Sequence, residues 1–249
     1  NVEGITFYLK GTSDSGRDID IPAVTDENGV AIFSEIPIGT YTIYEDEKTV
    51  PTAYLVADPQ NVTVTYAETK EVPIENKEKT GSITVHKTTE GQKNIEGIKF
   101  YLRGTSDSGR AIDIPATTDK DGIAKFDGVP IGTYMVIEDE ETVPYGYLVA
   151  DEKEVKVEYA QTIDETILNN EQTGTVKVHK KTADMTNVEG IRFILSGISD
   201  TGREIRIEAT TDKDGLAKFE GVPVGTYTIT EDGSTVPYGY LVADSKQVT

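Results

Sequence analysis

Residues 98–110, IKFYLRGTSDSGR, join an alternating apolar run to a segment rich in turn-forming residues. Ile98, Phe100 and Leu102 occupy every second position, which places them on one face of a β-strand. The Gly, Ser and Asp residues that follow are typical of turns. This stretch therefore predicts a half-buried β-strand that ends in a turn.

The same stretch recurs along the chain at a fixed spacing. GTSDSGR occupies residues 11–17 and 104–110, and the similar GISDTGR occupies residues 197–203. The offset of 93 residues is too long for a solenoid repeat and matches the size of a small independent domain. The sequence therefore predicts a tandem array of one module, present about two and two-thirds times.

Other parts of the repeat also read as β-strands separated by turns. TDKDG at residues 118–122 and PIGT at residues 130–133 are turn sequences, and no helical period is visible. The predicted fold class is all-β, with tandem antiparallel β-sandwich repeats of the Ig-like type in an elongated array. The predicted domains are residues 1–76, which lack the first strand of the repeat, residues 77–170, which form a complete repeat, and residues 171–249, which lack the last strand.

The composition excludes several classes of protein. A net charge of −20 and a pI of about 4.4 argue against binding to nucleic acid or to anionic membranes, which needs basic patches. The chain has no cysteine, so we expect neither disulfides nor thiolate metal sites. Only 36% of the residues are apolar, which gives each module a thin core that would profit from a covalent crosslink.

Three polar residue types recur where a strand face is otherwise apolar. In the middle repeat they are Lys87, Glu138 and Asn169, and each ends a stripe of alternating apolar residues. The matching residues elsewhere are Glu45 and Asn76 in the first repeat and Lys180 and Glu231 in the third. One such residue could be an accident, whereas three types at the same spacing indicate a built site.

Five ordered motifs of the middle repeat carry a resemblance to a known family. They are GSITVHK at 81–87, TDKDG at 118–122, GTYMVIE at 132–138, PYGY at 144–147 and ILN at 167–169. With these motifs the chain resembles the collagen-adhesin B-type (CnaB) or SpaA-type, prealbumin-like domains of Gram-positive surface adhesins and pilins. In that family a first-strand lysine and a last-strand asparagine form an isopeptide bond with the help of a glutamate. The resemblance implies that Lys87 and Asn169 are the crosslinked pair and that Glu138 is the catalytic residue.

The physical chemistry of buried groups agrees with these roles. Burial disfavours a lysine ammonium and lowers its pKa, which makes the amine of Lys87 nucleophilic. Burial also favours a protonated Glu138, which could donate a hydrogen bond to the amide oxygen of Asn169 and move protons as ammonia leaves. Folding supplies proximity, worth about 7–11 kcal/mol in well-oriented intramolecular reactions. The reaction occurs once in each module, so we expect no enzymatic turnover.

The other two repeats hold parts of the same set. By the same resemblance Glu45 and Glu231 are catalytic residues, and Asn76 and Lys180 are crosslinking residues. The lysine of the first repeat and the asparagine of the third fall outside the sequence, so these repeats are expected to be cut by the limits of a fragment. Two explanations stay open: flanking strands in a longer chain, which we favour, or strands donated between chains.

Each residue also has a simpler interpretation. A strand-end lysine such as Lys87 usually extends to water, Glu138 begins an acidic run, and asparagine at the position of Asn169 is a common turn former. The aspartates of residues 118–122 and 211–215 could suggest calcium, but these loops lack the distal glutamate of a calcium loop. We therefore expect ordinary turns, no metal site and no cofactor.

The predicted function is structural. The repeats would form the stalk of a cell-surface adhesin or pilin-like protein, extracellular and anchored to the cell wall, with a host or extracellular ligand bound by regions outside the fragment. The chain is expected to be a monomer that contacts neither membrane nor nucleic acid. The alternative is multivalent binding of a host glycan or matrix protein by the repeats themselves. Loops are among the most similar parts of the repeats, which favours the stalk.

Overall fold

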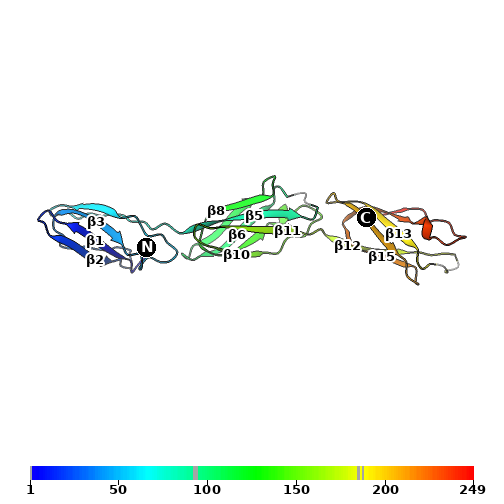
Figure 1. Cartoon of the computed structure of the whole chain (residues 1–249), viewed down its shortest axis with the longest axis horizontal. Coiled ribbons are helices and arrows are strands. Elements are labelled where there is room, and N and C mark those ends of the chain that lie inside the picture. Colours follow the sequence, from blue (N-terminus) through cyan, green and yellow to red (C-terminus); the bar gives the residue numbers. More distant parts are fainter. Residues whose placement is uncertain (1, 92–94, 184–185, 187) are drawn as a thin grey trace.

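The structure is a computed structural model that describes residues 2–91, 95–183, 186 and 188–249. Three bodies built of β-strands follow one another in a row along the long axis of the molecule (Figure 1). Each has its own cluster of buried apolar side chains. We call them the first, middle and third modules. In the described residues no helix is long and apolar enough to cross a membrane.

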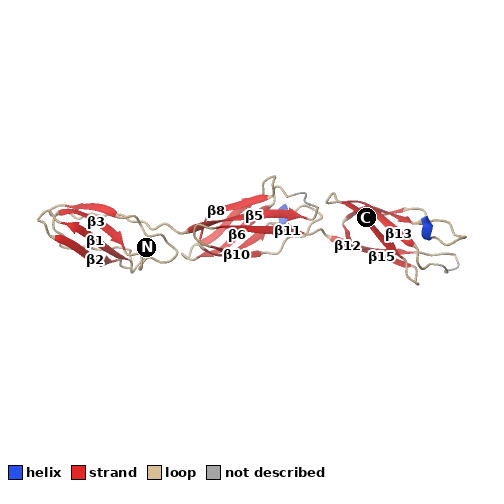
Figure 2. Ribbon diagram, in the orientation of Figure 1, coloured by secondary structure: helices blue, strands red, loops and turns tan. Residues whose placement is uncertain are grey.

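The middle module consists of two sheets that face each other (Figure 2). In spatial order, the first sheet contains β10 (Lys153–Val157), β9 (Gly132–Glu138), β6 (Lys99–Ser106) and β7 (Ala111–Thr117). The second sheet contains β11 (Thr162–Asn169), β5 (Thr80–Thr89) and β8 (Ile123–Pro130). A short 3-10 helix, η1 (Glu140–Thr142), follows β9. The chain is nearly all-β with several antiparallel sheets, which confirms the predicted fold class.

One pairing in the middle module is parallel. Strand β11 runs in the same direction as β5, its neighbour in the sheet, and Ile167 lies opposite Lys87. Among the described residues of this module all other strand pairings are antiparallel, including that of Phe100 with Glu138 between β6 and β9. The first and last strands of the module therefore lie side by side, and both reach the same end of the sheet.

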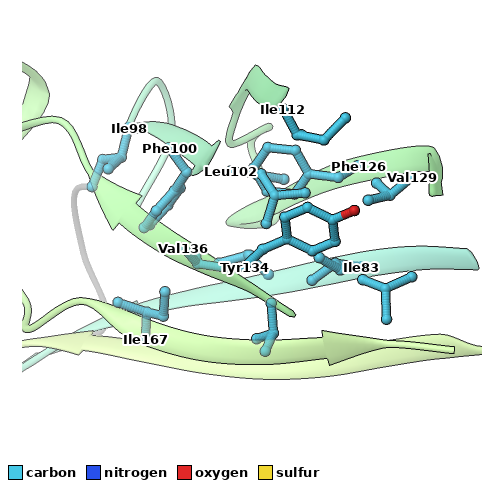
Figure 3. Packing of buried hydrophobic residues seen from close by; sticks show 14 residues of the cluster. Ile83, Ile98, Phe100, Leu102, Ile112, Phe126, Val129, Tyr134, Val136 and Ile167 are labelled. Atoms are coloured by element: carbon cyan, nitrogen blue, oxygen red, sulfur yellow. The ribbon is translucent and has the colours of Figure 1, made fainter. Parts of the chain in front are cut away.

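Alternation along these strands fills the space between the sheets. Phe100 and Leu102 from β6, Val136 from β9 and Ile83 from β5 are fully buried and point into one core (Figure 3). Tyr134 lies in the same cluster, and its hydroxyl donates to the carbonyl of Pro130 at 2.7 Å. Burial raises the pKa of Tyr134 to about 12. The predicted apolar face of residues 98–102 is confirmed by this packing.

The first and third modules contain fewer paired strands. The sheet of the first module contains, in order, β2 (Asp18–Val24), β1 (Thr6–Thr12), β3 (Gly39–Glu45) and β4 (Gln60–Val64). The third module has β14 (Glu204–Thr210), β13 (Arg192–Ser199), β16 (Gly225–Glu231) and β17 (Lys246–Val248), with β12 (Thr173–His179) and β15 (Leu216–Pro223) as a second sheet. A 3-10 helix, η2 (Gly233–Thr235), follows β16.

One strand expected from the sequence is not formed. Residues 72–76 match residues 165–169 of the middle repeat, so the repeat predicts a last strand there, but the structure assigns none. In the middle module the equivalent strand, β11, pairs with β5, and residues 1–76 contain no counterpart of β5. Val72 and Ile74 still pack against the core of the first module. Burial of apolar side chains thus persists without the backbone pairing.

Gly81 in β5 allows a close approach of backbone, which gives a first testable prediction. A Cβ atom at Gly81 would lie 2.5 Å from the carbonyl oxygen of Glu158 and 2.7 Å from that of Gln161. We expect Gly81→Ala to destabilise the middle module by about 1–3 kcal/mol, because backbone must move to accept the methyl group. Thermal unfolding followed by circular dichroism measures the effect.

The third module offers a matched control for this substitution. Gly174 is the equivalent residue, 93 positions later, and a Cβ atom there would meet nothing within 4 Å. Gly174→Ala should leave the melting profile unchanged or slightly raise the melting temperature. Equal effects of the two substitutions would show that the contact at Gly81 does not constrain the fold.

Candidate functional site

Three strands bring together the polar residues singled out in the middle repeat. Lys87 lies near the end of β5, Glu138 is the last residue of β9, and Asn169 is the last residue of β11. Their exposed fractions are 2%, 6% and 0%. Polar groups are rarely buried this completely unless they are paired, so each of the three side chains needs a partner inside the module.

The carboxyl group of Glu138 lies between the other two side chains. Its Oε1 atom is 3.5 Å from Nζ of Lys87, and its Oε2 atom accepts a hydrogen bond of 2.5 Å from Nδ2 of Asn169. The backbone N–H of Ala150 also donates to Oε2, at 2.9 Å. One oxygen of the carboxyl therefore faces the amine and the other faces the amide.

Backbone carbonyls hold the two partners of Glu138 in place. Nζ of Lys87 donates to the carbonyl oxygens of Thr88 at 2.7 Å and of Ile167 at 3.2 Å. Nδ2 of Asn169 donates to the carbonyl oxygen of Leu148 at 2.7 Å. From the sequence we expect the amide oxygen of Asn169 to face the carboxyl of Glu138, but in the structure the amide nitrogen faces it. The reason is that this nitrogen has two acceptors, whereas an oxygen there would face the Leu148 carbonyl.

The electrostatics of the cluster favour a reactive amine. Burial lowers the pKa of Lys87, and the nearby Glu138 acts in the opposite direction. Two buried oxygens of the cluster, Oε1 of Glu138 and Oδ1 of Asn169, accept no hydrogen bond from the described residues. Unsatisfied buried polar atoms cost about 1–3 kcal/mol each, so their retention needs an explanation other than stability.

In the first module the glutamate and asparagine meet in the same way. Oε2 of Glu45 accepts from Nδ2 of Asn76 at 2.6 Å and from the backbone N–H of Ala57 at 2.7 Å. Nδ2 of Asn76 also donates to the carbonyl oxygen of Leu55 at 2.9 Å. Oε1 of Glu45, which corresponds to the oxygen that faces Lys87, is buried and accepts no hydrogen bond from the described residues.

In the third module the lysine and glutamate meet. Nζ of Lys180 and Oε1 of Glu231 form an ion pair at 2.6 Å, and the backbone N–H of Ala243 donates to Oε2 of Glu231 at 2.6 Å. Only 10% of the Lys180 side chain is exposed. The first module thus contains the Glu–Asn pair and the third module the Lys–Glu pair, whereas the middle module contains all three residues.

The sequence reasoning missed the backbone donors that anchor the glutamates. They come from Ala57, Ala150 and Ala243, each 12 residues after its glutamate. The signal was present in the repeated LVAD sequence at residues 55–58, 148–151 and 241–244. Because these donors are main-chain atoms, the side chains of the motif do not reveal them.

The fold and the cluster together define a class of protein: a tandem array of β-sandwich modules with buried Lys, Glu and Asn side chains at the strand ends. A family model described as the SpaA prealbumin-like fold domain matches residues 1–78, 81–172 and 174–249. The chain belongs to this family.

The chain is similar to several solved structures at low sequence identity, and the first of them has the same fold. The TIE protein of Bacillus anthracis has a TM-score of 0.67 and 21% identity over 99% of this chain, which spans 45% of that structure. A streptococcal ancillary pilin has a TM-score of 0.40 and 20% identity, covering 100% of this chain and 88% of that one. The minor pilin GBS52 of Streptococcus agalactiae has a TM-score of 0.36 and 20% identity, covering 72% and 87%. A comparison with curated protein sequences gives no match.

Proposed function

We propose that these modules are stalk repeats of a Gram-positive cell-surface adhesin or pilin-like protein and that Lys–Asn isopeptide bonds crosslink each module internally. The buried cluster of Lys87, Glu138 and Asn169 carries this proposal. Membership in the SpaA prealbumin-like family supports a structural role of the pilin or adhesin kind. The proposed repeat units are residues 1–76, 77–170 and 171–249, and the proposed location is the cell surface, with anchoring to the cell wall.

The geometry of the cluster supports a direct acyl transfer. Neutral Nζ of Lys87 attacks Cγ of Asn169, the Nζ–Cγ bond forms, and the Cγ–Nδ2 bond breaks. Oε1 of Glu138 faces the amine and accepts the proton that Nζ loses, and the carboxyl group then passes this same proton to Nδ2, which Oε2 contacts and which leaves as ammonia. The carboxyl is regenerated, and the reaction needs no cofactor. Because each module reacts once, the process is a maturation step and not enzymatic turnover.

We assign the same roles to the residues of the end modules. Glu45 is positioned to serve Asn76, and Glu231 to serve Lys180. Each bond needs a strand that residues 1–249 do not include, either from a longer chain or from a second chain. The buried Oε1 of Glu45 supports this assignment, because it corresponds to the oxygen of Glu138 that faces Lys87 and accepts no hydrogen bond from the described residues.

The benefit of the bond is mechanical. It closes a loop of 82 positions between Lys87 and Asn169, which by analogy with disulfides is worth roughly 4–5 kcal/mol. Tension applied to the ends of the module would pass from β5 through the bond into the linker. The strands between residues 88 and 168 would then carry no load, which suits a stalk.

Small-angle scattering tests the stalk. A compact protein of this length would have a radius of gyration of about 18 Å. Three modules in a row, each at least as long as the 10-residue strand β5, should give roughly twice that value, since strands rise about 3.3 Å per residue. A radius near the compact value would contradict the extended arrangement.

A further inference from the structure

The linkers between modules contain two glutamates, Glu78 and Glu171, 93 residues apart. The backbone of each belongs to the preceding module. Glu78 forms a β-bridge with Tyr54, and Glu171 forms the equivalent bridge with Tyr147. On either side of Glu171 the chain is held by two hydrogen bonds of 2.8 Å, from Leu148 N–H to the Asn170 carbonyl and from Gln172 N–H to the Gly146 carbonyl.

The side chains of these glutamates enter the following module. Oε1 of Glu171 accepts from the hydroxyl of Thr201, and Oε2 accepts from the guanidinium of Arg203. The side chain of Glu171 is 0% exposed. A charged carboxylate is buried this fully only when it is paired, so the contact with the third module satisfies a group that the middle module supplies.

Glu78 makes the same pair of contacts one repeat earlier. Its Oε1 atom accepts from the hydroxyl of Ser108, and its Oε2 atom lies 2.8 Å from Nη2 of Arg110. The hydroxyl and the arginine belong to the GTSDSGR segment of the middle module, as Thr201 and Arg203 belong to the equivalent segment of the third. We call the contact between the first and middle modules the first joint and that between the middle and third modules the second joint. In both joints a linker glutamate binds a hydroxyl group and an arginine of the following module.

The receiving loop is shaped by its own hydrogen bonds. In the third module Oγ of Ser199 lies 2.7 Å from Oγ1 of Thr201 and accepts from the backbone N–H of Arg203 at 3.0 Å. The first module has the same two contacts, from Ser13 to Ser15 and to the Arg17 N–H, each at 3.0 Å. There Arg17 is paired with no carboxylate of the described residues. The loop therefore adopts its shape without a bound glutamate.

We propose that the loops at residues 106–110 and 199–203 are carboxylate sockets that receive the linker glutamate of the preceding module and fix the orientation of one module relative to the next. The partner of this surface is an extended linker segment that presents a single glutamate. The proposal does not depend on the isopeptide bond, because neither the glutamates nor the socket residues belong to the crosslinking cluster.

The two joints differ, and the difference predicts which is stiffer. At the second joint the side chain of Glu171 is 0% exposed. At the first joint 23% of the Glu78 side chain is exposed. We expect the second joint to allow less change of orientation than the first.

Spin-label distances between modules test the sockets, and the absence of native cysteine makes labelling selective. Asp127 and Glu220 are exposed, equivalent positions in the middle and third modules, and Ser34 is the equivalent in the first. With cysteines at 127 and 220, the wild-type background should give a narrow distance distribution. Glu171→Ala should broaden it roughly twofold, because relative motion is the default between domains that lack a firm interface. Glu171→Gln should fall between the two.

Controls separate the socket from general effects on folding. Arg203→Ala should broaden the 127–220 distribution as Glu171→Ala does, and the double variant should add little. Glu208→Ala removes only exposed ion pairs within the third module and should change nothing. The 34–127 distribution should be broader than the 127–220 distribution and insensitive to Glu171→Ala. If Glu171→Ala and Arg203→Ala both leave the 127–220 distribution unchanged while the modules remain folded, the sockets do not orient the modules.

Discussion

Glu138→Gln should yield a protein whose intact mass retains the ammonia that the proposed crosslink releases from the wild-type middle module. The carboxyl of Glu138 contacts both Nζ of Lys87 and Nδ2 of Asn169, and it is the group positioned to pass a proton from one to the other. Glutamine fills the same space but cannot serve as a proton carrier. We therefore expect no crosslink in this variant, measured by mass spectrometry of the intact denatured chain.

The same variant should be much less stable. Loss of the crosslink removes roughly 4–5 kcal/mol of loop-closure stabilisation. In the variant the uncrosslinked amine of Lys87 also stays buried without the carboxyl group that faces it, and an unsatisfied buried polar group costs about 1–3 kcal/mol. The total is comparable with the whole stability of a small domain, so we expect a large fall in the melting temperature of the middle module.

A control and an independent variant make this test decisive. Glu231→Gln changes the equivalent residue of the third module and should leave the middle-module mass unchanged. Asn169→Ala removes the electrophile, keeps Glu138 beside Lys87, and should also prevent the loss of ammonia. A wild-type chain that retains all its ammonia would refute the crosslink. A Glu138→Gln chain that still loses ammonia would show that Glu138 is not the proton carrier.

Pulling on the two ends of the chain should reveal a second large effect. In the wild-type protein the proposed bond between Lys87 and Asn169 should shield residues 88–168 from the load. In Asn169→Ala these residues should unravel and add about 270–290 Å of length, at roughly 3.3–3.6 Å per residue. Single-molecule force spectroscopy measures this added length directly.

The end modules provide an internal reference for the force experiment. Neither contains a complete Lys–Glu–Asn set, so both should extend in the wild type and in Asn169→Ala alike. The two traces should therefore differ by the middle-module step alone. A wild-type trace with that step at full length would mean that no covalent bond bridges the middle module.

Much of the fold follows from local patterns in the sequence. Alternation at Ile98, Phe100 and Leu102 predicts the strand face that forms the core, because the side-chain period of a strand is two. The same rule identifies Lys87 and Glu138 as polar residues on inward faces. These predictions succeed because a strand that is buried on one face alternates apolar and polar residues along the sequence.

Other features depend on contacts that no local pattern encodes. The failure of residues 72–76 to form a strand reflects a missing neighbour and not an unsuitable sequence, since Val72 and Ile74 still pack against the core. The amide orientation of Asn169 is set by the carbonyl of Leu148, 21 residues away. The partners of Glu171 lie 30 and 32 residues further along the chain. Such groups meet only when whole sheets and modules are assembled.

The parallel pairing of β5 with β11 also determines how the end-to-end length of the molecule increases with the number of repeats. Since both strands run in one direction, the polypeptide enters a module at one end and leaves at the other. An antiparallel pair would return the chain to its starting point, and successive copies would cluster. Here each duplication of a 93-residue segment extends the molecule by one further increment, so gene duplication alone could tune how far such a protein projects.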